Sequence, residues 1–453
     1  MPAQDAQQVD IKTLRRVIAA ASIGNFVEWF DFAAYGFLAT ILTREFFPNG
    51  DPTVGLLKTF AVFAVAFAFR PLGGLFFGVV GDRIGRKRTL AFTILLMAGS
   101  TTLIGLLPTY ARIGYWAPLL LTLIRCVQGF SAGGEYAGAC AYVMEHAPRR
   151  RRAFLGSFVP VSTFSSFACA AVVAYVLESS LSSAAMVDWG WRIPFLIAAP
   201  VGLIGVYLRI NLHETPAFRA LEGKKEVAHA PLMETLHSQS WNILKLGAFI
   251  SVTALSFYTF TTYFATYLQV AGHLSREASL LVTVLALCFA AALCPLAGLF
   301  SDRVGRRVTI ASTCVFIIAS VYPAFSLGGS GNLSQSLFGV ALLAVGAVLS
   351  GVVTAPLMSE VFATKTRYTA SAVTYNLAYT IFGGTAPLVA TWLISATGTN
   401  LSPAYYLIAV SIFAMIGGLA LHETSRTALE EAGSATGNAS DARSVSDALK
   451  QTS

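Results

Sequence analysis

Charge is scarce in this sequence. Only 12% of its 453 residues are Asp, Glu, Lys or Arg, whereas 55% are hydrophobic and the mean hydropathy is +0.65. Soluble domains carry about 25% charged residues. Most of the chain is therefore expected to face lipid or other parts of the protein, which excludes an ordinary soluble enzyme.

The sequence also lacks the short motifs of several protein classes. It contains no Gly-x-x-x-x-Gly-Lys-Ser/Thr loop, which argues against a pump driven by ATP, and no His-Glu-x-x-His pair. The six cysteines form no Cys-x-x-Cys pair and lie in or beside apolar runs, where small packing residues are common. We therefore expect no enzymatic activity, no metal site and no cofactor.

The formal net charge of +8 does not predict a nucleic-acid partner, because the basic residues lie between apolar runs and do not gather on one face. The expected surroundings are a lipid bilayer. Runs of about 20 apolar residues, the length that crosses the hydrocarbon layer, recur along the chain.

Twelve such runs predict an all-α membrane protein with twelve transmembrane helices. The expected spans are 17–42, 56–80, 89–107, 116–144, 153–178, 191–211, 241–270, 278–300, 308–328, 334–359, 367–396 and 402–421.

The distribution of basic residues predicts the orientation. Of the 31 Lys and Arg residues, 24 lie in the N-terminal segment, in the loops after the even-numbered spans or in the C-terminal tail, and five lie in the opposite loops. Because Lys and Arg accumulate on the cytoplasmic side, both termini are expected to be cytoplasmic.

An internal repeat divides the chain. The sequence GDRIGRK at 81–87 recurs as SDRVGRR at 301–307, and LHET at 212–215 recurs at 421–424. Transporters built from two parallel halves bind substrate between them, near the middle of the membrane. We predict a cytoplasmic N-terminal segment (1–16), a six-helix half (17–211), a cytoplasmic loop (212–240), a second six-helix half (241–422) and a disordered cytoplasmic tail (423–453).

Charged residues that recur in both halves predict a cytoplasmic gate. Asp82 is expected to pair with Arg152 and Glu145, and Asp302 with Arg367 and Glu360, so that the pairs hold the cytoplasmic side closed. The full set of predicted gate residues is Asp82, Arg83, Arg86, Glu145, Arg152, Asp302, Arg306, Glu360 and Arg367. The alternative is that the basic residues only fix the topology.

The span pattern and the repeated loop resemble the major facilitator superfamily. Four stretches are similar to its metabolite:proton symporter family: GNFVEWFDF at 24–32, RPLGG at 70–74, QGFSAGGEY at 128–136 and DWGWRIPF at 188–195. This resemblance implies a monomer in a bacterial cytoplasmic (inner) membrane. It also implies proton-coupled symport of an osmolyte such as proline or glycine betaine, or of an acid such as α-ketoglutarate or citrate.

Further stretches favour different branches of that family. FPNGDP at 47–52 and ETPAF at 214–218 resemble the proline/betaine transporters, whereas FYTFTTY at 257–263 resembles the α-ketoglutarate permeases. Arg125 departs from the osmolyte pattern, which has lysine there, and the tail lacks the coiled-coil heptads of the osmosensing members.

Ionisable residues within spans are costly and usually functional. Glu28 and Asp31 share one face of the first span, so their carboxylates repel and one is expected to stay protonated near neutral pH. We predict proton coupling by Glu28, Asp31 and Glu135. The alternative is a set of structural ion pairs.

Arg125 and Gln128 on the fourth span are predicted to bind substrate. Arg125 would pair with Glu28 or Asp31 in the empty site and bind a substrate carboxylate through its two-pronged guanidinium. Aromatic faces, which attract quaternary ammonium groups, predict a cage for betaine, although simple packing is the alternative. The predicted cage residues on spans 7 and 11 are Phe257, Phe260, Tyr263, Tyr375, Asn376 and Tyr379.

The sequence therefore predicts a proton-coupled symporter of a small zwitterionic osmolyte. A symporter of a di- or tricarboxylate is the alternative within the class. A channel or uncoupled facilitator is the alternative from another class, and the buried carboxylates argue against it because passive flow needs no proton carrier.

Overall fold

A computed structural model describes residues 11–48, 51–84, 86–133, 135–211, 232–362 and 367–425. Every regular element in these ranges is a helix. This follows from the composition, because a backbone in lipid must satisfy its hydrogen bonds within its own segment, as an α-helix does.

The first part of the chain forms what we call the N-terminal group of helices. It contains α1 (Ile11–Phe37), α2 (Ala39–Phe46), α3 (Pro52–Ile84), α4 (Arg86–Leu106), α5 (Tyr110–Ile113), α6 (Trp116–Ser131), α7 (Glu135–His146), η1 (Arg149–Arg151), α8 (Arg152–Gly156), α9 (Phe158–Ser180), α10 (Ser183–Asp188), η2 (Gly190–Arg192) and α11 (Ile193–Asn211).

The second part forms the C-terminal group. It contains α13 (Leu232–Tyr258), η3 (Thr259–Tyr263), α14 (Phe264–Val270), α15 (Arg276–Val304), α16 (Arg306–Gly328), α17 (Leu333–Glu360), α18 (Arg367–Ala378), η4 (Tyr379–Gly384), α19 (Ala386–Thr397) and α20 (Ser402–Leu419). Two of these helices have a side-chain N-cap: Ser275 and Asn332 accept hydrogen bonds from backbone N–H groups at the starts of α15 and α17.

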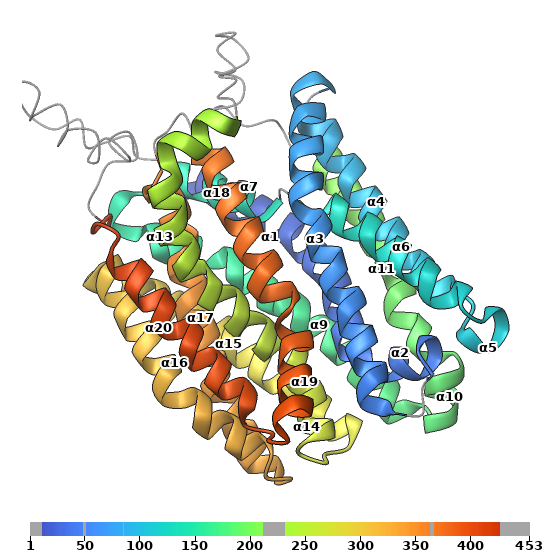
Figure 1. The fold of residues 1–453 in the computed structure, drawn as a ribbon. Coiled ribbons are helices and arrows are strands. Elements are labelled where there is room, and N and C mark those ends of the chain that lie inside the picture. Colours follow the sequence, from blue (N-terminus) through green and yellow to red (C-terminus); the bar gives the residue numbers. More distant parts are fainter. Residues whose placement is uncertain are drawn as a thin grey trace, which may run out of the picture.

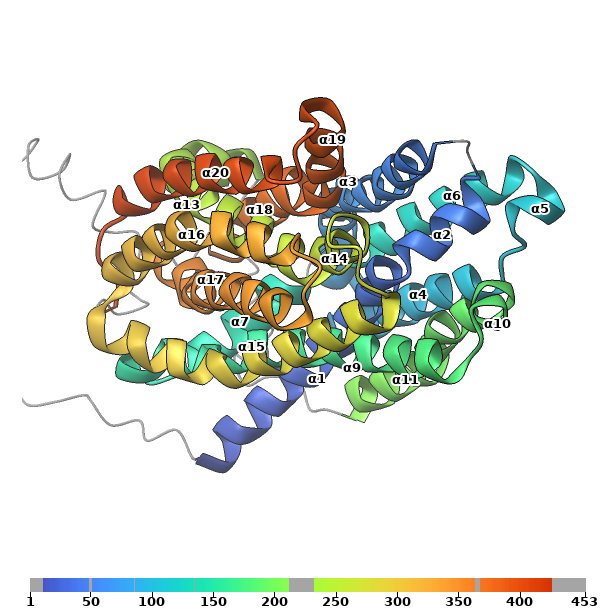
Figure 2. The same ribbon diagram turned by 90° about the horizontal axis from the view of Figure 1, so that it is seen from below.

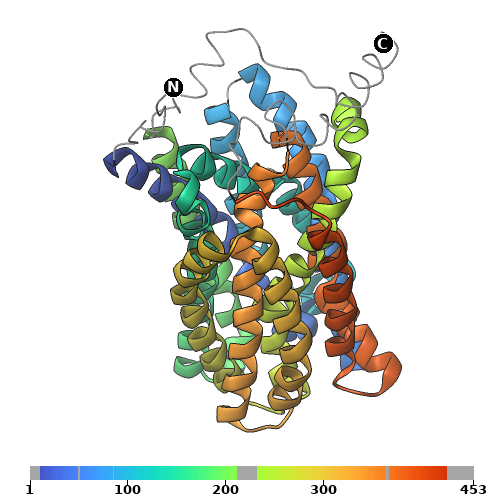
Figure 3. The same cartoon turned by 90° about the vertical axis from the view of Figure 1, so that its left-hand side faces the viewer.

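The two groups lie side by side (Figures 1 and 2). Helices α9 and α15 meet along one seam between them, and α3 meets η4 and α19 along another. Helix α1 begins and helix α20 ends at one end of the molecule, which we call the terminal end (Figure 3). The other end, where α2, α5 and α10 lie, we call the opposite end.

The outward surface is apolar. Large side chains such as Leu72, Trp392 and Ile416 are more than half exposed, as they would be against lipid. Nine helices among the described residues are long and apolar enough to cross a membrane. In the most apolar stretch of Ser238–Val270, 78% of residues are buried, against 39% for Pro52–Phe77, so the helix that contains α13 belongs to the core.

Helices occupy all twelve ranges in which spans were expected, with differences at the boundaries. Helix α13 begins at Leu232, inside the range expected to be a loop. Residues Glu423 to Ser425, expected to start a disordered tail, instead dock on α16, because Glu423 accepts hydrogen bonds from its first backbone N–H groups. The remainder of both predicted segments lies outside the described residues.

Candidate functional site

Several helical spans are interrupted, and three of the interruptions lie beside the pocket described below. The fourth expected span breaks between α6 and α7, and π-helical turns η3 and η4 interrupt the seventh and eleventh. Such interruptions cluster at functional sites, and in transporters discontinuous helices form the substrate site. The sequence pattern did not predict these interruptions.

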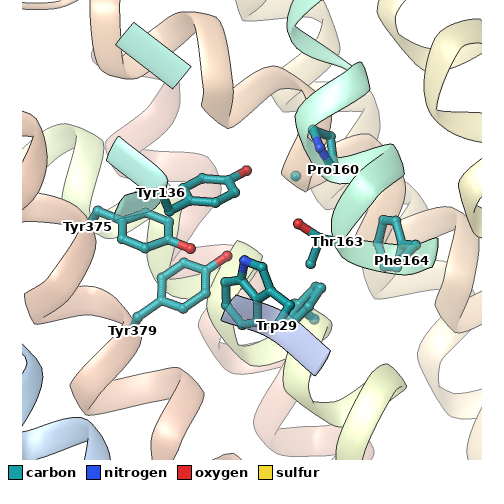
Figure 4. A pocket seen from close by; sticks show the side chains of 9 residues that line it. Trp29, Tyr136, Pro160, Thr163, Phe164, Tyr375 and Tyr379 are labelled. Carbon is teal, nitrogen blue, oxygen red and sulfur yellow. The ribbon is translucent and has the colours of Figure 1, made fainter. Parts of the chain in front are cut away.

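An aromatic pocket lies beside the interruptions. Its walls are Trp29, Tyr136, Pro160, Thr163, Phe164, Phe257, Gly351, Tyr375 and Tyr379, so both groups contribute. Figure 4 shows the rings of Trp29, Tyr136, Tyr375 and Tyr379 around one small space, with the tyrosine hydroxyls directed into it. The pocket therefore combines aromatic surfaces with a few polar atoms.

A stack of three tyrosines joins the groups at this pocket. The rings of Tyr136 and Tyr375 are 4.7 Å apart and those of Tyr375 and Tyr379 are 4.0 Å apart. Tyr136 belongs to the N-terminal group and the other two to the C-terminal group. Any movement of one group against the other must therefore disturb this stack.

Trp29 is held in place by hydrogen bonds. Its Nε1 donates to Asn25 Oδ1 at 2.9 Å, and Asn25 Nδ2 in turn donates to the hydroxyls of Ser162 and Thr163 at 2.8 and 2.7 Å. The indole packs against Phe257 with ring centres 5.4 Å apart. Helices α1, α9 and α13 thus fix the same ring.

A buried ion pair lies next to Trp29. Arg70 Nη2 on α3 donates to Glu28 Oε1 on α1 at 2.7 Å, and both side chains are about 1% exposed. The guanidinium carbon lies 5.4 Å from the centre of the Trp29 ring. Arg70 lies within the second expected span, and the sequence gave no signal of its partner.

Arg125, the predicted partner of Glu28, lies deeper in the N-terminal group. It donates to Gln128 Oε1, and Gln128 Nε2 donates to Thr101 Oγ1 at 2.6 Å. The guanidinium lies over the ring of Tyr35 at 4.3 Å. Neither Arg125 nor Gln128 is part of the pocket wall, so the structure does not bring them to the site where they were expected.

The predicted cage is brought together in part. Phe257, Tyr375 and Tyr379 line the pocket, but Phe260 packs behind it against Phe164. Tyr263 packs against Phe60, and Asn376 Nδ2 donates to the Gly133 carbonyl at 2.7 Å. Trp29, Tyr136, Phe164 and Gly351 were not predicted. The stretches at 24–32 and 128–136 that supported the family resemblance contain the first two.

One segment at the end of α6 matches a hydrolase motif that the sequence reasoning overlooked. Residues 129–133 read Gly-x-Ser-x-Gly, which positions a nucleophile when it forms a strand-to-helix turn. Here Ser131 ends a helix, and its hydroxyl donates to the Gln128 carbonyl at 2.8 Å. The spacing therefore reflects close helix packing.

A cluster of charges joins the groups at the terminal end; we call Arg152, Asp302, Arg306, Glu360 and Thr424 the terminal-end cluster. Glu360 accepts from Arg306 Nε and Nη2 at 3.0 Å each and from Thr424 Oγ1 at 2.7 Å. Arg152 Nη1 lies 3.5 Å from Glu360 Oε1. Arg152 belongs to the N-terminal group and Glu360 to the C-terminal group, so this contact crosses the seam.

Asp302 also crosses the seam. Its two carboxylate oxygens accept from the backbone N–H groups of Ala153 and Phe154 at 2.9 Å each, at the start of α8. The pairing predicted within the second half is therefore wrong in its partners: Asp302 contacts Arg306 and the opposite group. Close packing of α15 on α8 and α9 places this loop against the other group, which the repeat alone does not reveal.

Other predicted residues are placed less completely. Glu145 is exposed and interacts electrostatically with Arg367 across the seam. The side chains of Asp31, Asp82, Arg83, Arg86 and Glu135 lie outside what the structure describes. At the opposite end, Arg276 Nη1 and Glu178 Oε1 join the groups at 3.2 Å.

Glu423 supports the terminal-end cluster from the chain segment after α20. It accepts backbone hydrogen bonds from Arg306, Arg307 and Ser425 at 2.9, 3.0 and 3.0 Å. Partial burial by itself raises the pKa of this carboxyl, but the N–H donors lower it more, so the pKa lies below its ordinary value of 4.5.

We expect Glu423→Gln to lower stability near pH 7 and to have little effect in acid. Because the pKa is lower in the folded chain, the carboxylate stabilises the fold above its unfolded pKa, and this stabilisation is lost as the pH falls through the folded value. The expected loss is about 1 kcal/mol. Thermal unfolding of the purified protein at neutral and acid pH measures it, with exposed Glu277→Gln as the control. Equal losses at both pH values would contradict this account.

Two groups of helices around a central pocket, with discontinuous helices and a buried ion pair beside it, define the class of secondary transporters. The chain belongs to the major facilitator superfamily, whose family model matches residues 21–381. The predicted fold class is thereby confirmed.

Relatives named as transporters match nearly the whole chain. The proline/betaine transporter of Escherichia coli (strain K12) is 38% identical over 453 residues, covering 98% of this chain and 90% of that protein. The ectoine/proline transporter ProP of Corynebacterium glutamicum is 37% identical and covers 94% and 87%. The prediction of a transporter and not an enzyme is confirmed by these relatives.

Solved structures agree on the fold. The crystal structure of a D-xylose-proton symporter superposes with a TM-score of 0.69 over 90% of this chain and 98% of that chain, at 18% sequence identity. XylE of E. coli in a partially occluded inward open conformation superposes with a TM-score of 0.66, over 90% and 96% of the chains, also at 18% identity.

Proposed function

We propose that this protein takes up a small zwitterionic osmolyte, such as proline or glycine betaine, together with a proton by alternating access. The observation that carries the proposal is the aromatic pocket, which both groups of helices build and which lies next to the Glu28–Arg70 pair. The names of the relatives support the same class of substrate.

The chemistry of the pocket suits a cation whose charge is shielded by methyl or ring carbons. Aromatic faces attract such groups, and the attraction reaches about 2 kcal/mol or more when the site is dry. The described pocket wall contains rings, hydroxyls and no charged side chain. A polycarboxylate would need several cationic donors, so this wall favours a zwitterion over the di- or tricarboxylate alternative.

The proton is proposed to bind at Glu28, whose carboxylate is buried beside the pocket. Asp31 and Glu135 remain predictions for proton coupling. The coupled mechanism differs from an uncoupled facilitator in one respect that can be measured: only the former accumulates its substrate.

The terminal end is proposed to be the cytoplasmic end of a multi-pass protein in the bacterial inner membrane. The excess of Lys and Arg in the connections at this end supports the orientation. In this orientation the terminal-end cluster is a cytoplasmic gate, which closes when Asp302 and Glu360 contact α8 and Arg152. The protein is proposed to work as a monomer, because one chain supplies the pocket and the contacts between the two groups at the terminal and opposite ends.

Transport by purified protein in liposomes tests the proposal. With acid outside, labelled proline or glycine betaine should accumulate, and a protonophore should abolish the accumulation. Accumulation of α-ketoglutarate or citrate instead would favour the carboxylate alternative. Equilibration that the protonophore leaves unchanged would show a facilitator.

A matched pair of glycine variants tests the pocket itself. Gly351 lines the pocket and has open space around the position of a Cβ atom, so Gly351→Leu should fill the pocket and reduce uptake to background without loss of folding. Gly99 also has open space around its Cβ position but is exposed on α4, so Gly99→Leu should transport normally. Equal uptake by both variants would place the substrate elsewhere.

A further inference from the structure

Arg70 is a buried cation whose hydrogen-bonding capacity is only partly used. Its Nη2 donates to Glu28 and lies 3.5 Å from the Ala132 carbonyl. Nε and Nη1 are buried and donate to none of the described residues. A buried donor without an acceptor is costly, because it has lost its hydrogen bond to water. The described protein groups near these two donors include the Tyr258 hydroxyl, and they leave the guanidinium able to accept a further partner.

Arg70 lies behind the inner wall of the aromatic pocket. Its guanidinium stacks near Trp29, Phe32 and Phe67 at 5.1 to 5.4 Å from the ring centres. It also interacts electrostatically with the hydroxyls of Tyr375 and Tyr379, which Figure 4 shows directed into the pocket. The cation therefore lies against Trp29, one of the rings that line the pocket.

We propose that Arg70 binds the carboxylate of the substrate and that Glu28 competes with this carboxylate for it. The inference rests on the proposed function. A short zwitterion that bound Arg70 through two parallel N–H groups would need Nη2 together with Nε or Nη1, and Nη2 is the donor that Glu28 now occupies. Its cationic end would remain among the rings of the aromatic pocket.

Competition for Arg70 links the substrate to the proton. In the structure, Glu28 neutralises Arg70. A second carboxylate near one guanidinium would place two like charges close together in a dry site, which is costly. When Glu28 takes up a proton from water, Arg70 becomes available to the substrate carboxylate. The loaded site then has one additional positive charge, which lies on the substrate and is held by aromatic faces without a counter-ion.

The groups around Glu28 are compatible with this exchange. The titratable or charged groups that the structure records near it are Arg70 from α3 and Tyr258 from α13. Helix α9 presents hydroxyls to α1, including Ser162 and Ser166. Protonation of Glu28 therefore removes the negative charge that Arg70 faces in this pair.

A pair of ligands separates the role of Arg70 from general damage. Glycine betaine and choline have the same trimethylammonium group, but choline lacks the carboxylate. The wild-type protein should prefer betaine by about tenfold to a hundredfold, the worth of a charge-assisted hydrogen-bonded pair. Arg70→Gln should abolish this preference and Arg70→Lys should reduce it. Equilibrium binding to the purified protein measures the ratio.

Glu28→Gln tests the competition, because the amide resembles the protonated acid. Wild-type affinity for betaine should increase toward acid pH, whereas affinity in Glu28→Gln should be high and independent of pH. This variant should exchange substrate across a liposome membrane but should not accumulate it. A wild-type affinity that does not change with pH would overturn the competition.

Folding and function can be distinguished. If Arg70→Gln fails to fold because it leaves Glu28 buried without its cation, the Glu28→Gln/Arg70→Gln double variant removes both charges and is used for the comparison. A retained preference for betaine over choline in the folded variant would overturn the role of Arg70. If the wild-type protein binds neither betaine nor proline at any pH, the proposed function itself fails.

Discussion

Gly129→Ala should prevent stable folding. A Cβ atom at this position would lie 1.8 Å from the Ala66 carbonyl oxygen and 2.6 Å from its carbon, both of which are backbone atoms of α3. Side chains can move away from an added methyl group, but a helix backbone moves only as a unit. The axes of α3 and α6 would have to separate, at a cost of at least about 3 kcal/mol.

The same contact recurs along this helix pair. A Cβ atom at Gly73 on α3 would lie 1.6 Å from the Phe130 carbonyl oxygen, so the helices approach reciprocally. Folding is measured by the monodisperse fraction after size exclusion and by the apparent melting temperature. Gly99→Ala is the matched control, because nothing lies within 4 Å of its Cβ position. Similar stability of Gly129→Ala and Gly99→Ala would show that the helices are less closely packed.

Glu360→Ala should destabilise the protein and open its terminal end. Glu360 is the shared acceptor of Arg306 and Arg152, and the Arg306 side chain is about 1% exposed. Removal of one partner from a buried ion pair costs about 3–5 kcal/mol, since it leaves a buried charge without its counter-ion. The contact with Arg152 is also lost, and this contact holds the two groups together.

Two measurements separate these effects. Thermal unfolding reports the loss of stability, and maleimide labelling of Cys140 reports opening, because this buried cysteine lies on α7 between Tyr136 and the terminal end. The other five cysteines are replaced by serine for the labelling. Glu145→Ala removes an exposed carboxylate of the same region and should cost less than about 1 kcal/mol. Unchanged labelling and stability in Glu360→Ala would show that the cluster does not close this end.

The fold was predictable because the bilayer imposes a simple constraint on sequence. A span must be apolar for about 20 residues, and this requirement is visible without any knowledge of packing. The interruption at η3 was not predictable in the same way. Thr259 to Tyr263 are as compatible with an α-helix as with a π-helical turn, so the choice depends on neighbouring helices.

The interruption also explains why the predicted cage was only partly right. Helical spacing places Phe257, Phe260 and Phe264 on one face of a regular α-helix. A π-helical turn between Phe257 and Phe264 adds residues to the turn and rotates the helix beyond it. Phe257 therefore reaches the pocket, while Phe260 packs behind it and Phe264 packs against Tyr267 and Phe325.

Charge pairing shows a different limit of sequence reasoning. The cost of a charge within a span indicates that Glu28 needs a partner, but it does not select between Arg70 and Arg125. That selection depends on how α1, α3 and α6 are rotated about their axes. At the terminal end, the repeat identified the acidic and basic residues but not the crossing of contacts between the two groups.

The tyrosine stack has a consequence for the protein when it carries nothing. A symporter of the kind proposed above must return empty after each delivery, and it then has no ligand to draw its two groups together. The stacked rings of Tyr136 and Tyr375 hold the two groups in contact instead. Their centres are 4.7 Å apart, and they lie where we propose that the substrate binds. An aromatic pair is worth about 0.5–1.5 kcal/mol, which is enough to favour closure and weak enough for a ligand to displace. Without substrate, the transporter can therefore close on its own tyrosine side chains, which replace the contacts that a bound substrate would make between the two groups.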